Sequence, residues 1–200
     1  MPPTTLAELY VEELKDLYSA EKQILTALPK MIKAATHREL KQAFETHRQQ
    51  TEGHVQRLEQ IFEELGESPR GKKCHGMEGV IEEGAELMQN KPEPAVLDAG
   101  LIAAAQHVEH YEMAGYGTVR AWADKLGYND QAELLQQTLE EEKETDESLT
   151  QLAEAIVNDD ADIENEVEGG KAELADAPAR RATPNRTSKA GQTRPTARDR

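Results

Sequence analysis

The sequence predicts an all-α fold, a bundle of four long helices, and three observations favour it. Apolar residues recur at steps of three and four through residues 1–158, which is the period of one face of an α-helix. Aromatic residues make up only 4% of the 200-residue chain, so the core must be built from Leu, Ile, Val and Ala. Two long helical segments follow one another closely in each half, and a longer connection separates the halves.

The first two helices are separated by a short break. Leucines and isoleucines recur at helical spacing over residues 5–35, and Pro29 is expected to kink this helix. Thr36 and Glu39 fit a capping box, in which a hydroxyl and a carboxylate three residues apart bind the free backbone N–H groups at a helix start. The second helix is therefore expected to start there and to end before Gly66, a residue suited to the turn that follows many helices.

The last two helices are also consecutive. Pro94 suits the first turn of a helix, which is expected to run to about residue 126 and to end before Gly127. The fourth helix is expected to begin after residue 129 or 130, where Glu133 makes a second capping box, and to run to about residue 157. Each long helix has about 28–33 residues, hence a length of roughly 42–50 Å.

The connection lengths predict the topology. Only a few residues separate the helices within each half, so each half is expected to be an antiparallel helical hairpin. About 27 residues, 67–93, lie between the hairpins, and Met77–Met88 within them has a short helical pattern. Such a connection is long enough to carry the chain back along the bundle. Two hairpins joined by a long crossover form the ferritin-like arrangement of a four-helix bundle.

Charge divides the chain into three parts. Residues 1–170 carry 15 basic and 36 acidic side chains, whereas residues 171–200 carry eight basic and three acidic ones. The last stretch has one leucine and no other large apolar residue, so burial cannot offset the entropy of ordering it. The sequence therefore predicts a bundle over 1–158, an acidic linker over 159–170 and a disordered tail rich in Arg, Pro and Thr over 171–200.

Composition also bears on location and partners. The net charge of −16 argues against nucleic acid or an anionic membrane as a partner of the main body. No apolar run approaches the roughly 20 residues of a membrane span. The N-terminus is charged every few residues and lacks the apolar segment of a signal peptide. Since the single cysteine, Cys74, cannot form an internal disulfide, we expect a soluble, cytoplasmic protein.

Each helix places ionisable side chains on its otherwise apolar face, near its middle. They are Glu21 in the first helix, His47 and His54 in the second, Glu109 and Glu112 in the third, and Glu142 and Asp146 in the fourth. An unpaired buried carboxylate costs several kcal/mol, and no inward Lys or Arg offsets these five. Divalent cations would offset them, and mixed carboxylate and imidazole ligands suit iron or manganese. Because side chains three or four residues apart share a helix face, the pattern predicts a dinuclear metal site in the bundle centre.

A family resemblance rests on three segments of the chain. They are ELYVEELKDLYSAEKQILTALPKM in the first helix, VEHYEMAGYGTVRAWADKLG in the third and TLEEEKETDESL in the fourth. Over about residues 4–158 the chain resembles the YciF-type (DUF892) branch of the ferritin-like superfamily, and its ligand spacing is similar to that of the rubrerythrin diiron domain. By position, this resemblance implies two Fe ions, or Mn, bound by Glu21, His54, Glu109, Glu112, Glu142 and Asp146.

Two positions depart from the rubrerythrin-like pattern. Thr51 stands where a bridging glutamate is expected, and Asp146 stands where a histidine is expected. One of the metals is then either held less tightly or completed by water. His47, one turn before Thr51, is a candidate as a further ligand or as a hydrogen-bond donor to a ligand.

The sequence leaves three functions open. The first is a stress-associated protein whose two metals react with O₂ or peroxide, as in a peroxidase or a ferroxidase. The second is an iron-binding or structural stress protein without turnover. The third is a DNA-associated protein in which the basic tail, of net charge +5, binds phosphate weakly. Small residues spread around the third helix also favour a homodimer.

Overall fold

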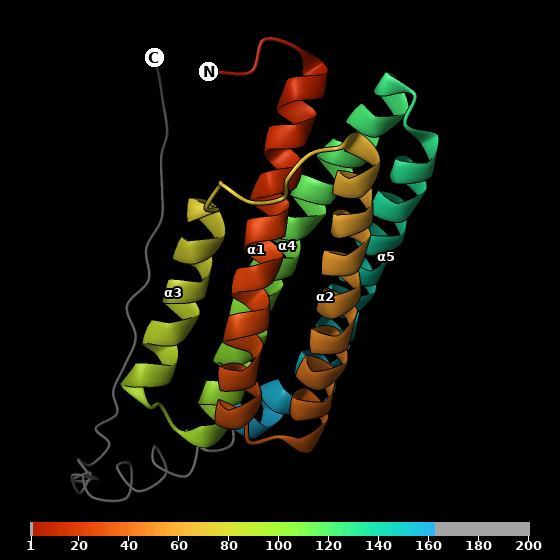
Figure 1. The fold of residues 1–200 in the computed structure, drawn as a ribbon. Helices are drawn as coiled ribbons and strands as arrows, with labels where there is room; N and C mark the ends of the chain where they lie inside the picture. The colour runs from red at the N-terminus through yellow and green to blue at the C-terminus, as the bar shows by residue number, and fades with distance from the viewer. Residues whose placement is uncertain (1, 163–200) are drawn as a thin grey trace, which may run out of the picture.

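Four long helices run side by side in the computed structural model, which describes residues 2–162 (Figure 1). They are α1 (Leu6–Ala34), α2 (Arg38–Leu65), α4 (Pro94–Leu126) and α5 (Asn129–Leu152). A shorter helix, α3 (His75–Asn90), lies in the connection between α2 and α4, and a π-helical segment, η1 (Ala153–Val157), continues α5. Helical residues run on to 162, past the expected end of the bundle at 158. The rest of the expected linker and the expected tail lie outside the described residues.

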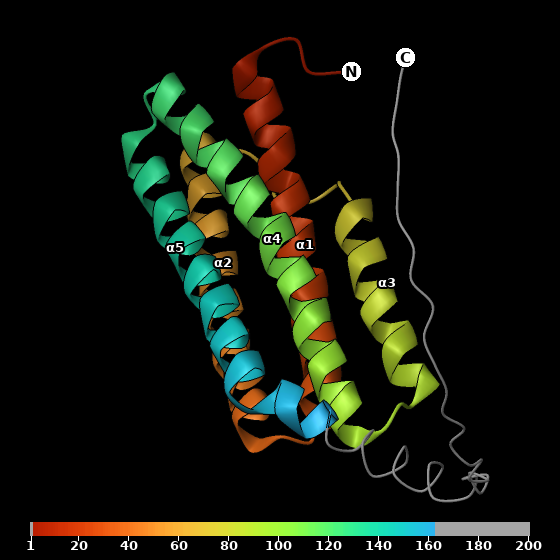
Figure 2. The same ribbon diagram turned by 180° about the vertical axis from the view of Figure 1, so that it is seen from behind.

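The long helices pack in the cyclic order α1, α2, α5, α4, and α3 lies against α1 and α4 on the outside of the bundle (Figures 1 and 2). The helices are antiparallel within each of the pairs α1–α2 and α4–α5. The prediction of an all-α bundle made from two hairpins and a long crossover with a short helix is therefore confirmed. No helix of residues 2–162 is long and apolar enough to cross a membrane.

The apolar core consists of two clusters, one in each half of the bundle. One includes Ile24, Leu28, Leu40, Phe44, Leu101, Ile102, Ala105 and Leu149. The other includes Tyr10, Leu14, Leu17, Leu58, Ile61, Phe62, Tyr116, Val119, Ala123 and Leu135. On each long helix the two clusters occupy different stretches, and the buried ionisable residues lie between them or at their margins. The middle of the bundle is thus a polar layer within an apolar core.

The start of α2 differs from the prediction. Thr36 and Glu39 do not form a capping box, and the N-cap residue is His37, which makes no side-chain cap hydrogen bond. Instead, the buried carboxylate of Asp98, from α4, accepts hydrogen bonds from the backbone N–H groups of Thr36 and His37, at 2.7 Å each, and from the Thr36 hydroxyl at 2.6 Å. A carboxylate from a distant helix therefore replaces the local cap.

The other helix ends agree with the prediction in part. Gly66 and Gly127 follow α2 and α4 in the left-handed conformation, as predicted, with φ of 67° and 81°. The capping box predicted with Glu133 is wrong, since α5 begins after Tyr128 without a side-chain cap. A capping box does form at the start of α1, where the Thr5 side chain accepts from the Glu8 N–H and the Glu8 carboxylate accepts from the Thr5 N–H.

Candidate metal centre

Six ionisable side chains from four helices meet in the middle of the bundle. They are Glu21 from α1, His47 and His54 from α2, Glu109 and Glu112 from α4, and Glu142 from α5. None is more than 3% exposed. Each falls on the inward face of its helix because it continues the spacing of the apolar residues around it.

Four of these side chains form one group. One ligand atom each of His47, Glu109, Glu112 and Glu142 lies within 4.8 Å of all the others. The Nε2 atom of His47 is 3.3 Å from Oε1 of Glu109, and its Nδ1 atom is 4.0 Å from Oε2 of Glu142. Three carboxylates and one imidazole at this spacing can surround a single divalent cation.

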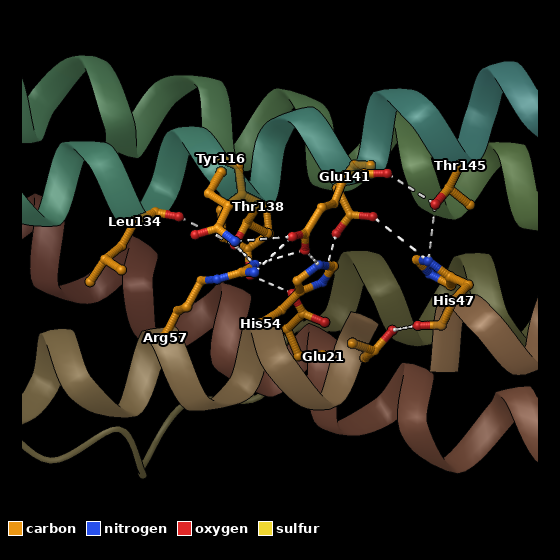
Figure 3. Close-up of polar contacts among 12 residues, drawn as sticks. Glu21, His47, His54, Arg57, Tyr116, Leu134, Thr138, Glu141 and Thr145 are labelled. Atoms are coloured by element: carbon orange, nitrogen blue, oxygen red, sulfur yellow. Dashed lines mark hydrogen bonds and ion pairs between the residues drawn. The ribbon is translucent and has the colours of Figure 1, made fainter. Parts of the chain in front are cut away.

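A second group lies beside the first and shares Glu142 with it. It consists of Glu21, His54 and Glu142, again with one ligand atom each within 4.8 Å of the others. The Nδ1 atom of His54 is 3.0 Å from Oε1 of Glu142 and 3.4 Å from Oε1 of Glu21. Figure 3 shows His54 and His47 at successive positions along the bundle, with polar contacts linking α2 to α5. Since Oε1 of Glu142 faces His54 and Oε2 faces His47, this carboxylate can bridge two cations.

Several polar atoms of the two groups are buried and make no hydrogen bond, although Nδ1 of His54 and Oε1 of Glu142 among them lie 3.0 Å apart as an ion pair. They are both oxygens of Glu112 and of Glu142, Oε2 of Glu21 and of Glu109, Nε2 of His47 and Nδ1 of His54. Buried polar groups in native proteins almost always have partners, so a concentration of unpartnered atoms at one place requires an explanation. A bound cation would satisfy oxygens and imidazole nitrogens together, and the residues therefore fit a metal.

Burial and mutual repulsion affect the carboxylates unequally. Burial, together with the charge of Glu142, raises the pKa of Glu109 well above the usual 4.5, and burial beside Glu21 does the same to the pKa of Glu112. Burial also acts against the charge of Glu142, but His54 and His47 outweigh it and lower the pKa of Glu142. Glu142 is thus the carboxylate that the protein itself keeps ionised, while Glu109 and Glu112 favour protons that a cation would displace.

The two histidines differ in the same way. Burial lowers the pKa of His47, so its imidazole is neutral and free to bind a metal. Burial opposes the charge of His54, but Glu21, Glu141 and Glu142 outweigh it and raise the pKa of His54 to about 12. Without a metal, the imidazolium of His54 offsets part of the negative charge, and a metal would take the place of its proton.

The orientation of His54 is fixed from outside the two groups. Its Nε2 atom is 2.8 Å from Oε2 of Glu141, and Arg57 donates to both oxygens of Glu141, at 2.8 and 2.7 Å (Figure 3). Arg57 also donates to the Thr138 hydroxyl at 3.0 Å. Against the effect of burial, His54 and Arg57 lower the pKa of Glu141 to about 2. This network turns Nδ1 of His54 towards Glu21 and Glu142, a common arrangement for a metal-binding histidine.

Glu21 and His47 are also held by neighbours. The hydroxyl of Tyr116 donates to Oε1 of Glu21. The Thr145 hydroxyl donates to the backbone carbonyl of Glu141 and lies 3.4 Å from Nδ1 of His47. The other ring nitrogen of His47, Nε2, makes no hydrogen bond. The ligand atoms are therefore set in place by side chains that need no metal.

The structure brings together five of the six residues named as ligands from the sequence, all except Asp146. The Asp146 Oδ1 atom accepts a hydrogen bond from Gln106 at 3.1 Å and lies 3.4 Å from Nε2 of His110, and the side chain is 22% exposed. One turn beyond Glu142, Asp146 interacts with α4 at the edge of the bundle and belongs to neither group. His47, left open as a ligand, lies in the first group instead.

Thr51 does not contribute to either group. It is fully buried, and its hydroxyl donates to the backbone carbonyl of His47 at 2.9 Å, within α2. The position where a bridging glutamate is expected therefore carries no carboxylate, and its hydroxyl is bound to the backbone of its own helix. Glu142, from α5, is the carboxylate placed to bridge.

Sequence analysis missed the pair of Glu141 and Arg57. Glu141 stands in a run of glutamates, 140–142, of which the apolar spacing marks only Glu142 as inward-facing. A signal was nevertheless present, because Arg57 follows His54 by three residues and so shares its helix face. Its guanidinium pairs with Glu141 rather than with the central carboxylates.

A helical bundle with two buried carboxylate–histidine groups, joined through one glutamate, defines a class of protein able to bind metal in its core. The chain belongs to the DUF892 family, described as a domain of unknown function, whose match covers residues 5–162. It is similar to Protein YciF of Escherichia coli (strain K12), with 46% identity over 159 residues, which cover 79% of this chain and 96% of the relative. The family resemblance found in the sequence is confirmed.

Solved structures give the same result. The crystal structure of the E. coli stress protein YciF superposes with a TM-score of 0.75 at 46% identity, covering 78% of this chain and 99% of that one. YcfI of Rhodopseudomonas palustris, a candidate structural protein, gives 0.72 at 43% identity, covering 74% and 94%. A protein of Xanthomonas campestris shares the fold, with a TM-score of 0.64 at 23% identity, covering 80% and 99%.

Proposed function

We propose that this protein is a ferritin-like stress protein that binds two divalent metal ions, iron or manganese, in the middle of its bundle. The observation that carries the proposal is the position of Glu142, whose two oxygens face two different histidines while both lack hydrogen bonds. His47, Glu109 and Glu112 complete one group around it, and Glu21 and His54 complete the other.

The remaining residues prepare this centre. Two adjacent metals, when bound, supply electrons to dioxygen or to peroxide. Glu112, with both oxygens free of hydrogen bonds, would be able to hold a metal through either oxygen. Glu141 and Arg57 orient His54, and Tyr116 orients Glu21. Burial of all six ligands keeps bulk water away from the centre.

The stress role comes from the relatives. The E. coli relative with a solved structure is described as a stress protein, and its similarity extends over nearly its whole length. A second candidate function, a structural protein, follows from the description of the R. palustris relative. The two candidates differ in one testable respect, because a purely structural role needs no metal in the core.

Metal analysis of the purified protein separates them. Fe, Mn and Zn per chain would be measured by mass spectrometry in the wild type, in a Glu109→Ala/Glu142→Ala variant and in a Glu140→Ala/Glu144→Ala control, whose two substituted side chains are exposed. We expect about two Fe or Mn per chain in the wild type and in the control, and little in the variant. A wild type without metal after anaerobic loading with Fe(II), or a variant that retains it, would refute the proposal.

A further inference from the structure

A cavity of about 60 Å³ adjoins one side of the metal centre. All five α-helices contribute to its lining, which includes Ile24 and Leu28 of α1, Phe44 of α2, Ile81 of α3 and Val108 of α4. His47 and Glu109, two of the residues of the first ligand group, also line it. The cavity therefore reaches the first ligand group, in which Nε2 of His47 and Oε2 of Glu109 have no hydrogen bonds.

The lining favours an apolar occupant. Apart from His47 and Glu109, its polar side chains are Thr145 and Lys30, and the rest are Ala, Gly, Val, Leu, Ile, Met and Phe. A buried water needs room for one molecule, about 10–15 Å³, and also two to four polar partners. This cavity has the room, but along most of its length it lacks the partners. Empty apolar cavities of this kind stay dry and bind small apolar molecules such as xenon.

Helix α3 closes the outer side of the cavity, and its packing on α4 depends on small residues. A Cβ atom added at Gly84 would lie 3.3 Å from Cβ of Ala104, and one added at Gly76 would lie 2.7 Å from the ring of Tyr111. Because α3 packs closely on α4, the side chains of Val80 and Ile81 of α3 form part of the cavity lining. The lining includes both Lys30, which is exposed, and His47 and Glu109, which are buried in the middle of the bundle.

We propose that this cavity binds dioxygen and delivers it to the His47 side of the metal centre. Dioxygen is apolar and small enough for a 60 Å³ space, whereas hydrogen peroxide would lose hydrogen bonds to water that this lining cannot replace. Between the two oxidants left open by the sequence, the mainly apolar lining thus favours dioxygen. The reaction of dioxygen with bound metals rests on the proposed function, but the binding of dioxygen in the cavity does not.

Dioxygen is paramagnetic, so its binding can be measured on the metal-free full chain by NMR of labelled methyl groups. Under oxygen pressure, we expect faster relaxation at the methyl groups of Ile24, Leu28 and Val108 than at those of Leu14 and Leu58, which belong to the other core cluster. The same pressure of nitrogen is the control for pressure effects. Equal enhancement in both clusters would overturn the proposal.

A variant that fills the cavity tests the site itself. Ala105→Leu places three more carbon atoms in the lining, and we expect it to lower the enhancement at Val108 by about tenfold. Ala123→Leu is the matched control, because it enlarges an equally buried alanine of α4 that does not line the cavity. If Ala105→Leu does not fold, Ala43→Leu fills the same cavity from α2. Full enhancement in a folded cavity-filling variant would overturn the proposal.

Loading with Fe(II) separates this proposal from the proposed function. With metal content unchanged, we expect Ala105→Leu to slow Fe(II) oxidation by dioxygen about tenfold and to leave oxidation by peroxide nearly unchanged. Equal slowing with both oxidants would overturn delivery through the cavity. A wild type that binds dioxygen in the cavity but takes up no metal would refute the proposed function and leave the dioxygen site standing.

Discussion

At the scale of single residues, the candidate centre depends most on Glu142. Its two oxygens lie 3.0 Å from Nδ1 of His54 and 4.0 Å from Nδ1 of His47, so both ligand groups contain it. Histidines keep it ionised despite full burial. Asp146, one turn further along α5, has its own partners in Gln106 and His110.

Substitution at these two positions should therefore have opposite results. We expect Glu142→Gln, which keeps the shape and removes the charge, to abolish tight binding of both metals. We expect Asp146→Asn to retain both, because Asp146 lies in neither group. Titration with Mn(II), followed by calorimetry, measures the number of sites. Loss of a metal in Asp146→Asn would show that Asp146 is a ligand after all.

Glu141 acts on the centre through His54. It holds Nε2 of this histidine at 2.8 Å and is itself held by Arg57. Removal of such a supporting carboxylate typically weakens metal affinity by about 10–100-fold, which we expect for Glu141→Gln, with the number of sites unchanged. Glu140→Gln, at the exposed neighbouring position, is the control and should bind as the wild type does. An unchanged affinity in Glu141→Gln would contradict the orienting role.

The same residues give the metal-free protein a pH dependence. Burial raises the pKa of Glu109 and Glu112, so the folded protein keeps two protons that the unfolded chain releases above pH 4.5. The neighbouring carboxylates raise the pKa of His54, so folded His54 likewise keeps a proton that the unfolded chain releases between pH 6.5 and about 12. These contributions to stability are complete at low pH and are lost as the pH rises. His47, whose pKa is lowered, acts in the opposite sense below pH 6.5, whereas the contribution of Glu142 is constant above pH 4.5.

We therefore expect the metal-free protein to lose stability from about pH 5 to about pH 8. Glu112→Gln should reduce this loss, since a neutral amide has no proton to release on unfolding. The urea concentration at half-unfolding, measured in a chelator at several pH values for both proteins, checks this. An equally steep loss in the variant would contradict the raised pKa of Glu112.

The sequence predicted that carboxylates and histidines meet in the middle of the bundle, and five of the six residues named from it do meet there. Glu21, Glu109, Glu112 and Glu142 could be found because each interrupts an apolar stripe, a property of one helix alone. Whether Asp146 or His47 reaches the centre depends on how α2 and α5 are rotated about their axes relative to each other. The apolar pattern of a single helix carries no information about that rotation. Family spacing favoured Asp146, but Gln106 of α4 holds it at the edge of the bundle.

At the scale of helices, the start of α2 depends on Asp98, which lies 61 positions after His37 along the chain. Three donors from Thr36 and His37 converge on the buried carboxylate of Asp98. This contact ties the α1–α2 turn to the first part of α4 and so aligns the two hairpins. It also explains why the local capping signal at Thr36 gave the wrong prediction, since Asp98 accepts from the Thr36 N–H that Glu39 would bind in a capping box.

Loss of this carboxylate should be costly. We expect Asp98→Ala to lower the free energy of unfolding by about 1–2 kcal/mol, because the part-buried N–H groups of Thr36 and His37 at the start of α2 lose their acceptor. Asp98→Asn, which keeps one acceptor oxygen, should lose less. Urea unfolding followed by circular dichroism gives both values, and Thr118→Ala, an exposed position in the same helix, is the control. A change below about 0.5 kcal/mol in Asp98→Ala would contradict the capping role.

At the scale of the whole molecule, connection lengths determined what could be predicted. Two short links and one crossover of about 27 residues were sufficient to predict two hairpins, and the structure has them. The lengths did not show that α3 packs on α1 and α4, because this follows from the glycines and alanines at the α3–α4 contact. The cavity beside the centre is a consequence of that packing, and no pattern along the chain contained it.

The homodimer inferred from the sequence remains a proposal. We expect light scattering of the full-length protein to give twice the chain mass of 22.2 kDa. A mass twice that of the shortened chain after deletion of residues 171–200 would place the contact in the bundle rather than in the basic tail. A mass of 22.2 kDa at micromolar concentration would refute the dimer, and a much larger mass would favour storage in a cage.

The central claim is that the middle of this bundle holds two metals joined by Glu142. Anomalous X-ray diffraction from crystals loaded with Fe(II) or Mn(II) tests it most directly, because it places the metals among the residues. We expect two peaks about 3.5–4 Å apart, one beside His47, Glu109 and Glu112 and the other beside Glu21 and His54. No peak between the two apolar clusters, or a single peak beside Asp146 and His110, would contradict the claim.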